Sequence, residues 1–252
     1  MRVYLSDGSR VTLAEDSDGD GAAETITPLV REISTLDRSN AGLTLGPDGS
    51  LYISLAATCG AFCTQADAAA GSVVAIDPEN RALRVVATGL EQPSALAFAP
   101  GGAPWMVRAR GSSLCGMPDV VVTVQDGVDC AGILCGSGEA SLDAPESIAL
   151  GEGSGLRALV WFASELLPPD LSGGFFVAFA ADEAGAAGSV QFVQRDADGR
   201  LSVRDFATGF DDPVALAAGS DGMPYVADAG RGVIYWIGPP LESDTSAAVL
   251  ED

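Results

Sequence analysis

Residues 87–102 read ATGLEQPSALAFAPGG, and residues 207–222 read ATGFDDPVALAAGSDG. In both segments a short apolar run follows a proline and ends in a turn that contains glycine. Two further copies of the second half are PESIALGEG at 145–153 and AGLTLGPDG at 41–49, the latter without the proline. Short apolar strands that recur with such turns between them predict an all-β protein built from repeats.

Further strands accompany these copies. A second strand follows at Leu51–Ser54 and at Met223–Ala227, and Gly-Ser-Val strands occur at 71–76 and 188–193, each before a turn and a final strand. Four-stranded units that repeat roughly every 50 residues are typical of β-propeller blades. We therefore predict an all-β fold, a β-propeller of about five four-stranded blades, with four or six blades as the alternatives.

The units define one domain. They begin near residues 41, 93, 145 and 213, and the last shows only three strands. A partial unit precedes them, with strands near 2–5, 10–15 and 24–31. We expect a single β-propeller domain over 1–238 and a polar tail or linker over 239–252. Pairing of strands from the two ends of the chain would complete the outer units.

The composition excludes several kinds of chemistry. The 252 residues include 35 Asp and Glu but 13 basic residues, all of them arginine, which gives a formal net charge of -22. Without histidine, a Ser-His pair or a His-ligated zinc is excluded, and without lysine, a P-loop or a Schiff base is excluded. A chain with this much negative charge repels phosphate backbones and anionic lipid. We therefore expect no nucleic-acid partner.

Cysteine usage indicates the compartment. The five cysteines are best explained by disulfides, which favour an extracytoplasmic setting: periplasmic, secreted or cell-surface. No apolar stretch reaches the ~18 residues of a membrane span, so no direct membrane insertion is expected. We expect that a targeting segment was removed or that the chain belongs to a larger protein. The cysteines are Cys59, Cys63, Cys115, Cys130 and Cys135, and long loops stapled by disulfides are expected, most readily Cys115 with Cys130 or Cys135.

An acidic loop is the clearest candidate site. Alternating aspartates, a glycine that permits a sharp bend and a further acid resemble the first part of a calcium loop, because hard cations bind six to eight oxygens. The alternative is a solvated acidic turn. The predicted ligands are Asp16, Asp18, Asp20, the carbonyl of Ala22, and Glu24. A second acidic segment, Asp196–Gly199, is predicted to be a hairpin turn only.

At these residues the chain resembles the glucose/sorbosone dehydrogenase family of soluble quinoproteins. This resemblance implies a six-bladed propeller that oxidises sugars with pyrroloquinoline quinone (PQQ). The matching runs cover close to half of the chain, in the family's order. They are Glu15–Thr25, Gly42–Leu55, Leu83–Gly101, Leu166–Ala181 and Ala207–Gly238.

The chain differs from the family at the positions that carry the family's catalytic and quinone-binding residues. The resemblance implies a histidine base near Arg38, an arginine at Glu91, an arginine before Pro213, a histidine at Ala180 and a lysine near Val190. This chain has no histidine or lysine, and it has Asp211 and Asp212 before Pro213. PQQ carries three carboxylates and needs cationic partners, so we expect calcium as a cofactor but not PQQ.

Three functions remain open. The first is a non-catalytic extracytoplasmic propeller that acts as a binding or scaffold module or as a subunit of a larger assembly, with a calcium-stabilised loop. The second is a PQQ-dependent sugar dehydrogenase with an altered active site. The third is a calcium-dependent lactonase-type hydrolase. For the first, a protein partner is expected and a sugar ligand is an alternative. The three tryptophans, Trp105, Trp161 and Trp236, are predicted to pack in the core rather than to form a sugar platform.

Overall fold

The computed structural model describes most of the chain. Its described residues are 1–6, 10–31, 33, 42–55, 71–88, 90, 93–100, 102, 104–108, 119–124, 126–129, 147–151, 155–181 and 187–238. Among them, strands account for nearly all regular structure, and the one helical turn is a short 3-10 segment at Pro169–Leu171. Within this described part, no helix has the length and apolarity that crossing a membrane requires.

The strands of the described residues form five separate sheets, and each sheet is built mainly from consecutive strands. The first sheet comprises β1 (Arg2–Ser6), β2 (Val11–Glu15) and β3 (Thr25–Val30). The second comprises β4 (Leu43–Leu45), β5 (Leu51–Leu55), β6 (Ser72–Ile76) and β7 (Leu83–Thr88), with the short β11 (Val128–Asp129) parallel to β7.

The remaining three sheets follow the same antiparallel plan. The third comprises β8 (Pro93–Phe98), β9 (Pro104–Arg108), β10 (Asp119–Thr123) and β12 (Ser147–Gly151). The fourth comprises β13 (Leu156–Phe162), β14 (Gly174–Phe179), β15 (Gly188–Arg195) and β16 (Leu201–Phe210). The fifth comprises β17 (Pro213–Ala218), β18 (Pro224–Asp228) and β19 (Val233–Trp236).

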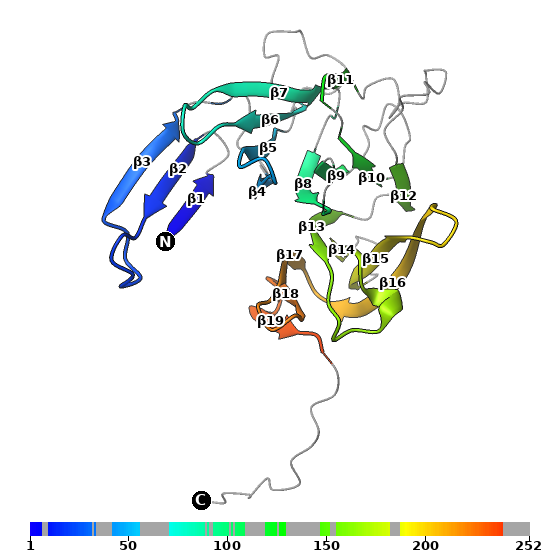
Figure 1. Ribbon diagram of the computed structural model, residues 1–252. Helices are drawn as coiled ribbons and strands as arrows, with labels where there is room; N and C mark the ends of the chain where they lie inside the picture. The colour runs from blue at the N-terminus through cyan, green and yellow to red at the C-terminus, as the bar shows by residue number, and fades with distance from the viewer. Residues whose placement is uncertain are drawn as a thin grey trace, which may run out of the picture.

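The five sheets succeed one another around an arc, with the first and fifth sheets at its two ends (Figure 1). Apolar side chains fill each junction between adjacent sheets. Val11 and Leu13 of the first sheet pack with Leu51 and Ile53 of the second, and Phe176 of the fourth sheet shares a cluster with Val226 of the fifth. Burial of alternate apolar residues between successive sheets is what holds propeller blades together.

The prediction of an all-β propeller with about five blades is confirmed, including three strands at each end. Two details were wrong. The copy at 145–153 does not begin a blade, because β12 pairs with β10 as the outer strand of the third sheet, and β13 is the inner strand of the fourth. The expected pairing of the two chain ends is also not seen in the described strands: β1 pairs with β2, and β19 with β18.

The repeated turn has one geometry in two places. The Gly46 amide donates to the Ser50 carbonyl at 2.8 Å, and the Gly219 amide donates to the Met223 carbonyl at 2.8 Å. The fourth residue of each turn, Gly49 or Gly222, has a φ of +80° or +77°, which favours glycine. The repeat therefore records a backbone requirement as well as an apolar pattern.

Inside each of these hairpins an aspartate holds a tyrosine. Asp48 accepts a hydrogen bond from the Tyr52 hydroxyl at 3.1 Å, and Asp221 accepts one from the Tyr225 hydroxyl at 2.8 Å. This pair was not predicted from the sequence, although the identical spacing of aspartate and tyrosine in the two copies is a usable signal. It fixes the tyrosine ring over the first glycine of the turn.

Candidate functional site

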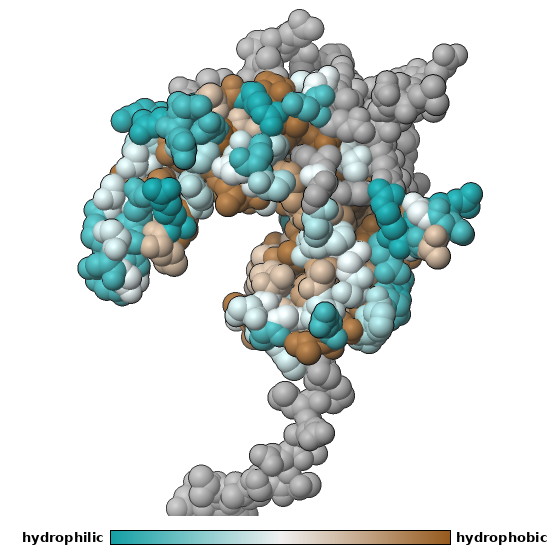
Figure 2. Space-filling view, viewed as in Figure 1, coloured by the Kyte–Doolittle hydropathy of each residue, from teal (hydrophilic) through white to brown (hydrophobic). Residues whose placement is uncertain are grey.

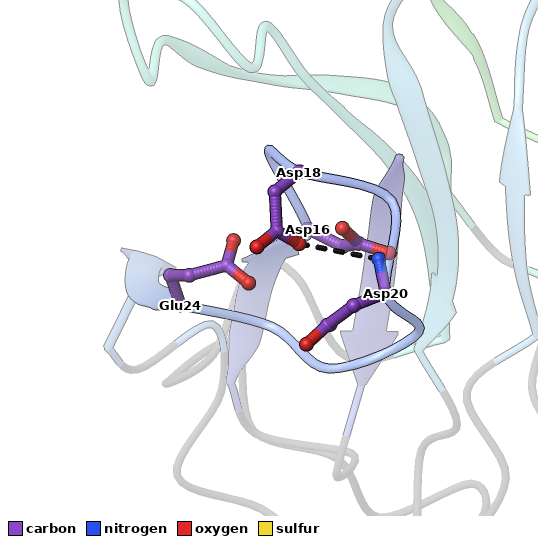
Figure 3. A group of neighbouring side chains, drawn as sticks. All are labelled: Asp16, Asp18, Asp20 and Glu24. Carbon is purple, nitrogen blue, oxygen red and sulfur yellow. Dashed lines mark hydrogen bonds between the residues drawn. The ribbon is translucent and has the colours of Figure 1, made fainter.

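The acidic loop between β2 and β3 turns back on itself at two glycines. Gly19 and Gly21 have φ values of +84° and +91°, a region that residues with a Cβ rarely adopt. This tight path places the side chains of Asp16, Asp18, Asp20 and Glu24 around one point (Figure 3). The sharp bend predicted at Gly21 is confirmed, and the strands on either side make this a hairpin loop rather than a helix-flanked one.

The four carboxylates are close to one another. One oxygen from each of them can be chosen so that all lie within 4.8 Å of each other. Asp16 is buried, with 6% of its surface exposed, whereas the other three are exposed. Like charges at this separation repel, so a divalent cation between them would relieve the repulsion.

Hydrogen bonds from the loop hold these side chains in place. Asp16 accepts from the amides of Gly19 at 2.5 Å and Gly21 at 3.1 Å. Glu24 accepts from the amide and the hydroxyl of Ser17, at 2.7 Å and 2.9 Å. The Ala22 amide donates to Asp20 at 2.7 Å, so Ala22 lies beside the cluster, and its carbonyl as a ligand stays a prediction.

The same hydrogen bonds favour the ionised form of Asp16 and Glu24. The bond from the Gly19 amide is the main cause that lowers the pKa of Asp16 below its ordinary value, and it outweighs burial, which raises it. The bonds from the Ser17 amide and hydroxyl likewise lower the pKa of Glu24. Ionised carboxylates are the form that binds a hard cation, so the donor set fits calcium.

The position before Pro213, at which the family resemblance implies an arginine, is acidic and already paired. Asp211 contacts the Arg231 guanidinium at 3.0 Å, and Asp212 lies 3.5 Å from Arg157. The buried carboxylate of Asp228 accepts the amides of Asp211 and Asp212, both at 2.9 Å. Hydrogen bonding to Asp211 raises the pKa of Arg231 further. Arg231 and Arg157 are thus each paired with an aspartate.

Of the other positions that the resemblance singles out, two lie in the described part of the structure and two do not. Val190 is buried in the apolar cluster between the fourth and fifth sheets, so a side chain there contacts core residues. The Ala180 amide donates to the Gly155 carbonyl at 3.0 Å. Arg38 and Glu91 lie outside the described residues, as do Cys59, Cys63, Cys115, Cys130, Cys135 and the tail 239–252.

The tryptophans behave differently from one another. Trp161 packs edge-on against Phe175, with ring centroids 4.9 Å apart, as predicted for a core residue. It also lines an apolar pocket of about 400 Å³ together with Val193 and Leu201, which the sequence pattern did not reveal. The prediction of core packing is wrong for Trp236, whose surface is 38% exposed. The side chain of Trp105 lies outside the described part of the structure.

Comparison with known proteins supports the fold. No family model matches the chain, and no curated protein matches it either. Several solved structures do match. An oxidoreductase (glucose dehydrogenase) from Thermus thermophilus has a TM-score of 0.62 and 19% identity, over 93% of this chain and 74% of its own.

Two fungal structures match in the same way. The PQQ domain of pyranose dehydrogenase from Coprinopsis cinerea, in its holo form, has a TM-score of 0.70 and 13% identity, over 94% of this chain and 79% of its own. The calcium structure of a family AA12 carbohydrate-active enzyme from Trichoderma reesei has a TM-score of 0.68 and 12% identity, over 93% and 77%. The chain therefore has the β-propeller fold of the glucose/sorbosone dehydrogenase-like proteins.

Proposed function

We propose that this protein is a non-catalytic extracytoplasmic β-propeller that binds another protein, with calcium holding the loop between β2 and β3. One observation carries the proposal. Asp211 and Asp212 stand where the resemblance implies a quinone-binding arginine, and both are committed to ion pairs with Arg231 and Arg157. A tricarboxylate such as PQQ would meet added negative charge there.

Burial at a second position supports the same conclusion. Val190, near which the resemblance implies a lysine, is 1% exposed within the apolar core. The chain has no histidine to act as a general base near neutral pH. Neither the cationic partners nor the base that sugar oxidation requires is supplied by these positions.

Reconstitution with PQQ tests this proposal. We expect no quinone absorption bands to appear in the dialysed protein and no dye-linked oxidation of glucose or other aldoses. A parallel sample of a PQQ-dependent glucose dehydrogenase, prepared in the same way, controls for the cofactor and the dye. Quinone that stays bound, together with sugar oxidation, would overturn the proposal.

A PQQ-dependent sugar dehydrogenase with an altered site is the second candidate. It is favoured by the fold alone, because one structural neighbour is described as the holo form of a PQQ domain. Under this alternative, Arg157 or Arg231 would release its aspartate to bind the quinone. Substitution of Asp211 and Asp212 by asparagine would then increase quinone binding, whereas the non-catalytic proposal predicts that binding stays undetectable.

Calcium binding is tested separately. Calcium at about 100 times its dissociation constant stabilises a protein by about 2.7 kcal/mol, so we expect the melting temperature to rise by several degrees. The double variant Asp16→Asn, Asp20→Asn should lose this rise. The matched control is Asp196→Asn, Asp198→Asn, in the other acidic hairpin, which should keep it. An equal rise in both variants would show that the loop is only a solvated turn.

The extracytoplasmic setting has its own test. Two disulfides among the five cysteines would leave at most one free thiol in each chain. Alkylation of the unreduced, denatured protein followed by mass spectrometry counts these thiols. Five alkylated cysteines in protein exported to an oxidising compartment would contradict the prediction.

A further inference from the structure

A pocket lies in the junction between the third and fourth sheets, and the functions considered so far do not use it. Its volume of about 400 Å³ is within the range of small-molecule sites, and most of its wall is apolar. The apolar wall is formed by side chains of the fourth sheet and of the turn after β8: Trp161, Phe175, Val193, Leu201, Ala99 and Pro100.

The strand register explains why the junction is hollow here. Trp161, Phe175 and Val193 lie side by side in one row across β13, β14 and β15. The next residue of β15 on this face is Arg195, and the residue opposite it, just before β14, is Gly173. A Cβ at Gly173 would meet no atom within 4 Å, so no side chain fills the space beside Phe175.

The pocket is at the other end of the fourth sheet from the positions that the family resemblance singles out. Gln194, which lines the pocket, pairs with the first residue of β14. Ala180 follows the last residue of β14, and Asp211 follows the end of β16, which pairs with the start of β15. Because β14 has six residues, roughly 17 Å separate the two ends. The pocket is therefore distinct from those positions.

Two hydrogen-bond donors belong to residues that line the pocket. The Trp161 Nε1 atom is buried, and within the described structure it has no acceptor. A buried donor without an acceptor is unfavourable, because it has lost its bond to water. Arg195 donates through Nη1 to the Gly199 carbonyl at 3.0 Å, and this bond holds its guanidinium at the hairpin turn. A ligand with an acceptor group matches these donors.

The turn beside the pocket is hydrophilic. Figure 1 shows the turn between β15 and β16 projecting from the fourth sheet, and Figure 2 shows mainly hydrophilic residues on it. Its aspartate nearest to Arg195 is Asp196, whose carboxylate accepts the amides of Asp198 and Arg200 at 3.0 Å and 2.9 Å. Of these four charged residues, Arg195 is the one that lines the pocket. The charge at the pocket is thus positive, although the whole chain is acidic.

We propose that this pocket binds a small aromatic carboxylate. Its flat apolar body packs on the Trp161 and Phe175 rings, and its carboxylate accepts the indole N–H and pairs with Arg195. Burial of the aromatic surface supplies most of the affinity, and the two donors select an acceptor with negative charge. The inference goes beyond the proposed protein-binding role. Its test measures a small ligand at a different site, so the two proposals can fail independently.

Calorimetric titration with 2-naphthylacetate tests the proposal. We expect one site per chain with a dissociation constant of about 0.1 mM. Leu201→Trp fills the pocket and should abolish binding. Leu83→Trp is the matched control and should not change it, because Leu83 begins β7 after the turn at Asp77 as Leu201 begins β16 after the turn at Asp196. Absence of binding to the parent, or unchanged binding to Leu201→Trp, would overturn the proposal.

The neutral ligand 2-naphthylacetamide separates the two donors. It should bind about fivefold more weakly than the acid, because the ion pair with the exposed Arg195 is lost. Arg195→Gln should weaken binding of the acid by about the same factor and leave the amide unchanged, whereas Arg200→Gln, in the same turn, should affect neither ligand. Trp161→Phe keeps an aromatic ring but removes the N–H, and should weaken both ligands by about fivefold. Equal affinities for acid and amide, or unchanged affinities in Arg195→Gln or Trp161→Phe, contradict the assignment.

A fluorescence measurement keeps the proposal testable if Leu201→Trp does not fold. Iodine quenches tryptophan fluorescence on contact, so 4-iodobenzoate should quench the parent protein with a saturable component. This component should be absent from Trp161→Phe and present in Trp236→Phe, because Trp236 does not line the pocket. Quenching without saturation in the parent, or a saturable component that persists in Trp161→Phe, would rule out this site.

Discussion

The second and fifth sheets contain the same hairpin in different surroundings. In both, a glycine-rich turn places an aspartate four residues before a tyrosine that donates a hydrogen bond to it, Asp48 with Tyr52 and Asp221 with Tyr225. Tyr52 is then enclosed by Phe98 and by the Arg84 guanidinium, which donates to its hydroxyl at 2.9 Å. Tyr225 shares Asp221 with the Trp236 indole, which donates to it at 3.0 Å.

The difference separates local from tertiary stabilisation. The turn, its glycines and the hydrogen bond between aspartate and tyrosine form in both places, so they depend on the local sequence. The packing on the tyrosine ring depends on the next sheet, which covers Tyr52 but not Tyr225. Burial of apolar surface is the larger contribution to stability, so the two copies should respond unequally to the same substitution.

Removal of the ring should give the largest difference. Tyr52→Ala deletes a buried aromatic ring at a junction between sheets, and we expect it to lower the free energy of unfolding by about 4 kcal/mol. Tyr225→Ala removes a ring that solvent already reaches and should have a much smaller effect. Urea unfolding of both variants measures this, with circular dichroism as the probe. Equal losses would mean that the Tyr225 face is covered in solution.

The first glycine of the turn gives an intermediate test. A Cβ at Gly46 would lie 2.5 Å from the Tyr52 ring, and a Cβ at Gly219 would lie 2.4 Å from the Tyr225 ring. The enclosed Tyr52 ring cannot move aside, so Gly46→Ala should destabilise by about 2 kcal/mol. The Tyr225 ring can rotate toward solvent, and Gly219→Ala should cost less. A larger thermal shift for Gly219→Ala than for Gly46→Ala would contradict the comparison.

Acidification should produce the smallest effect, and in the fifth sheet's pair a neighbouring tryptophan can report it. The hydrogen bond from Tyr225 is the main cause that lowers the pKa of Asp221, and bonds from the Met223 amide and the Trp236 indole add to it. Because the pKa of folded Asp221 is depressed, its stabilisation is present above the ordinary aspartate pKa of about 3.9 and is lost as the pH falls through the lower folded value.

Trp236 can report this titration. Its fluorescence should change as the pH falls below the ordinary aspartate pKa and through the lower pKa of folded Asp221, where this carboxylate becomes protonated. In Asp221→Asn this step should be absent, whereas Asp196→Asn, in a turn without an aromatic partner, should retain it. A change in the fluorescence that is identical in all three proteins would assign it to another group.

Much of the architecture could be predicted from the sequence because its causes are local. Apolar strands, the glycine-containing turns that end at Gly49 and Gly222, and the sharp bend at Gly21 are each determined within a few residues. The same is true of the hairpin turn at Asp196, where the Asp196 amide donates to the Arg200 carbonyl at 2.8 Å. These features were therefore predicted correctly.

Features that depend on distant partners could not be predicted in the same way. The copy at 145–153 has the residues of an inner strand, yet β12 is an outer one, because position within a blade is set by pairing and not by composition. The parallel pairing of β11 with β7 joins strands that belong to different units. The ion pairs of Asp211 and Asp212 depend on Arg231, in the turn between β18 and β19, and on Arg157, which belongs to β13.

An arc of sheets that touch only their neighbours has a consequence for unfolding. In a closed ring every sheet is held on both sides, but among the described sheets the first and the fifth each pack against one neighbour only. Opening should therefore begin at the two ends and advance inward, as in linear repeat proteins, rather than occur everywhere at once. Amides of β2 and β18 should exchange with solvent sooner than those of β6 and β14, and the most persistent structure should lie in the middle of the chain.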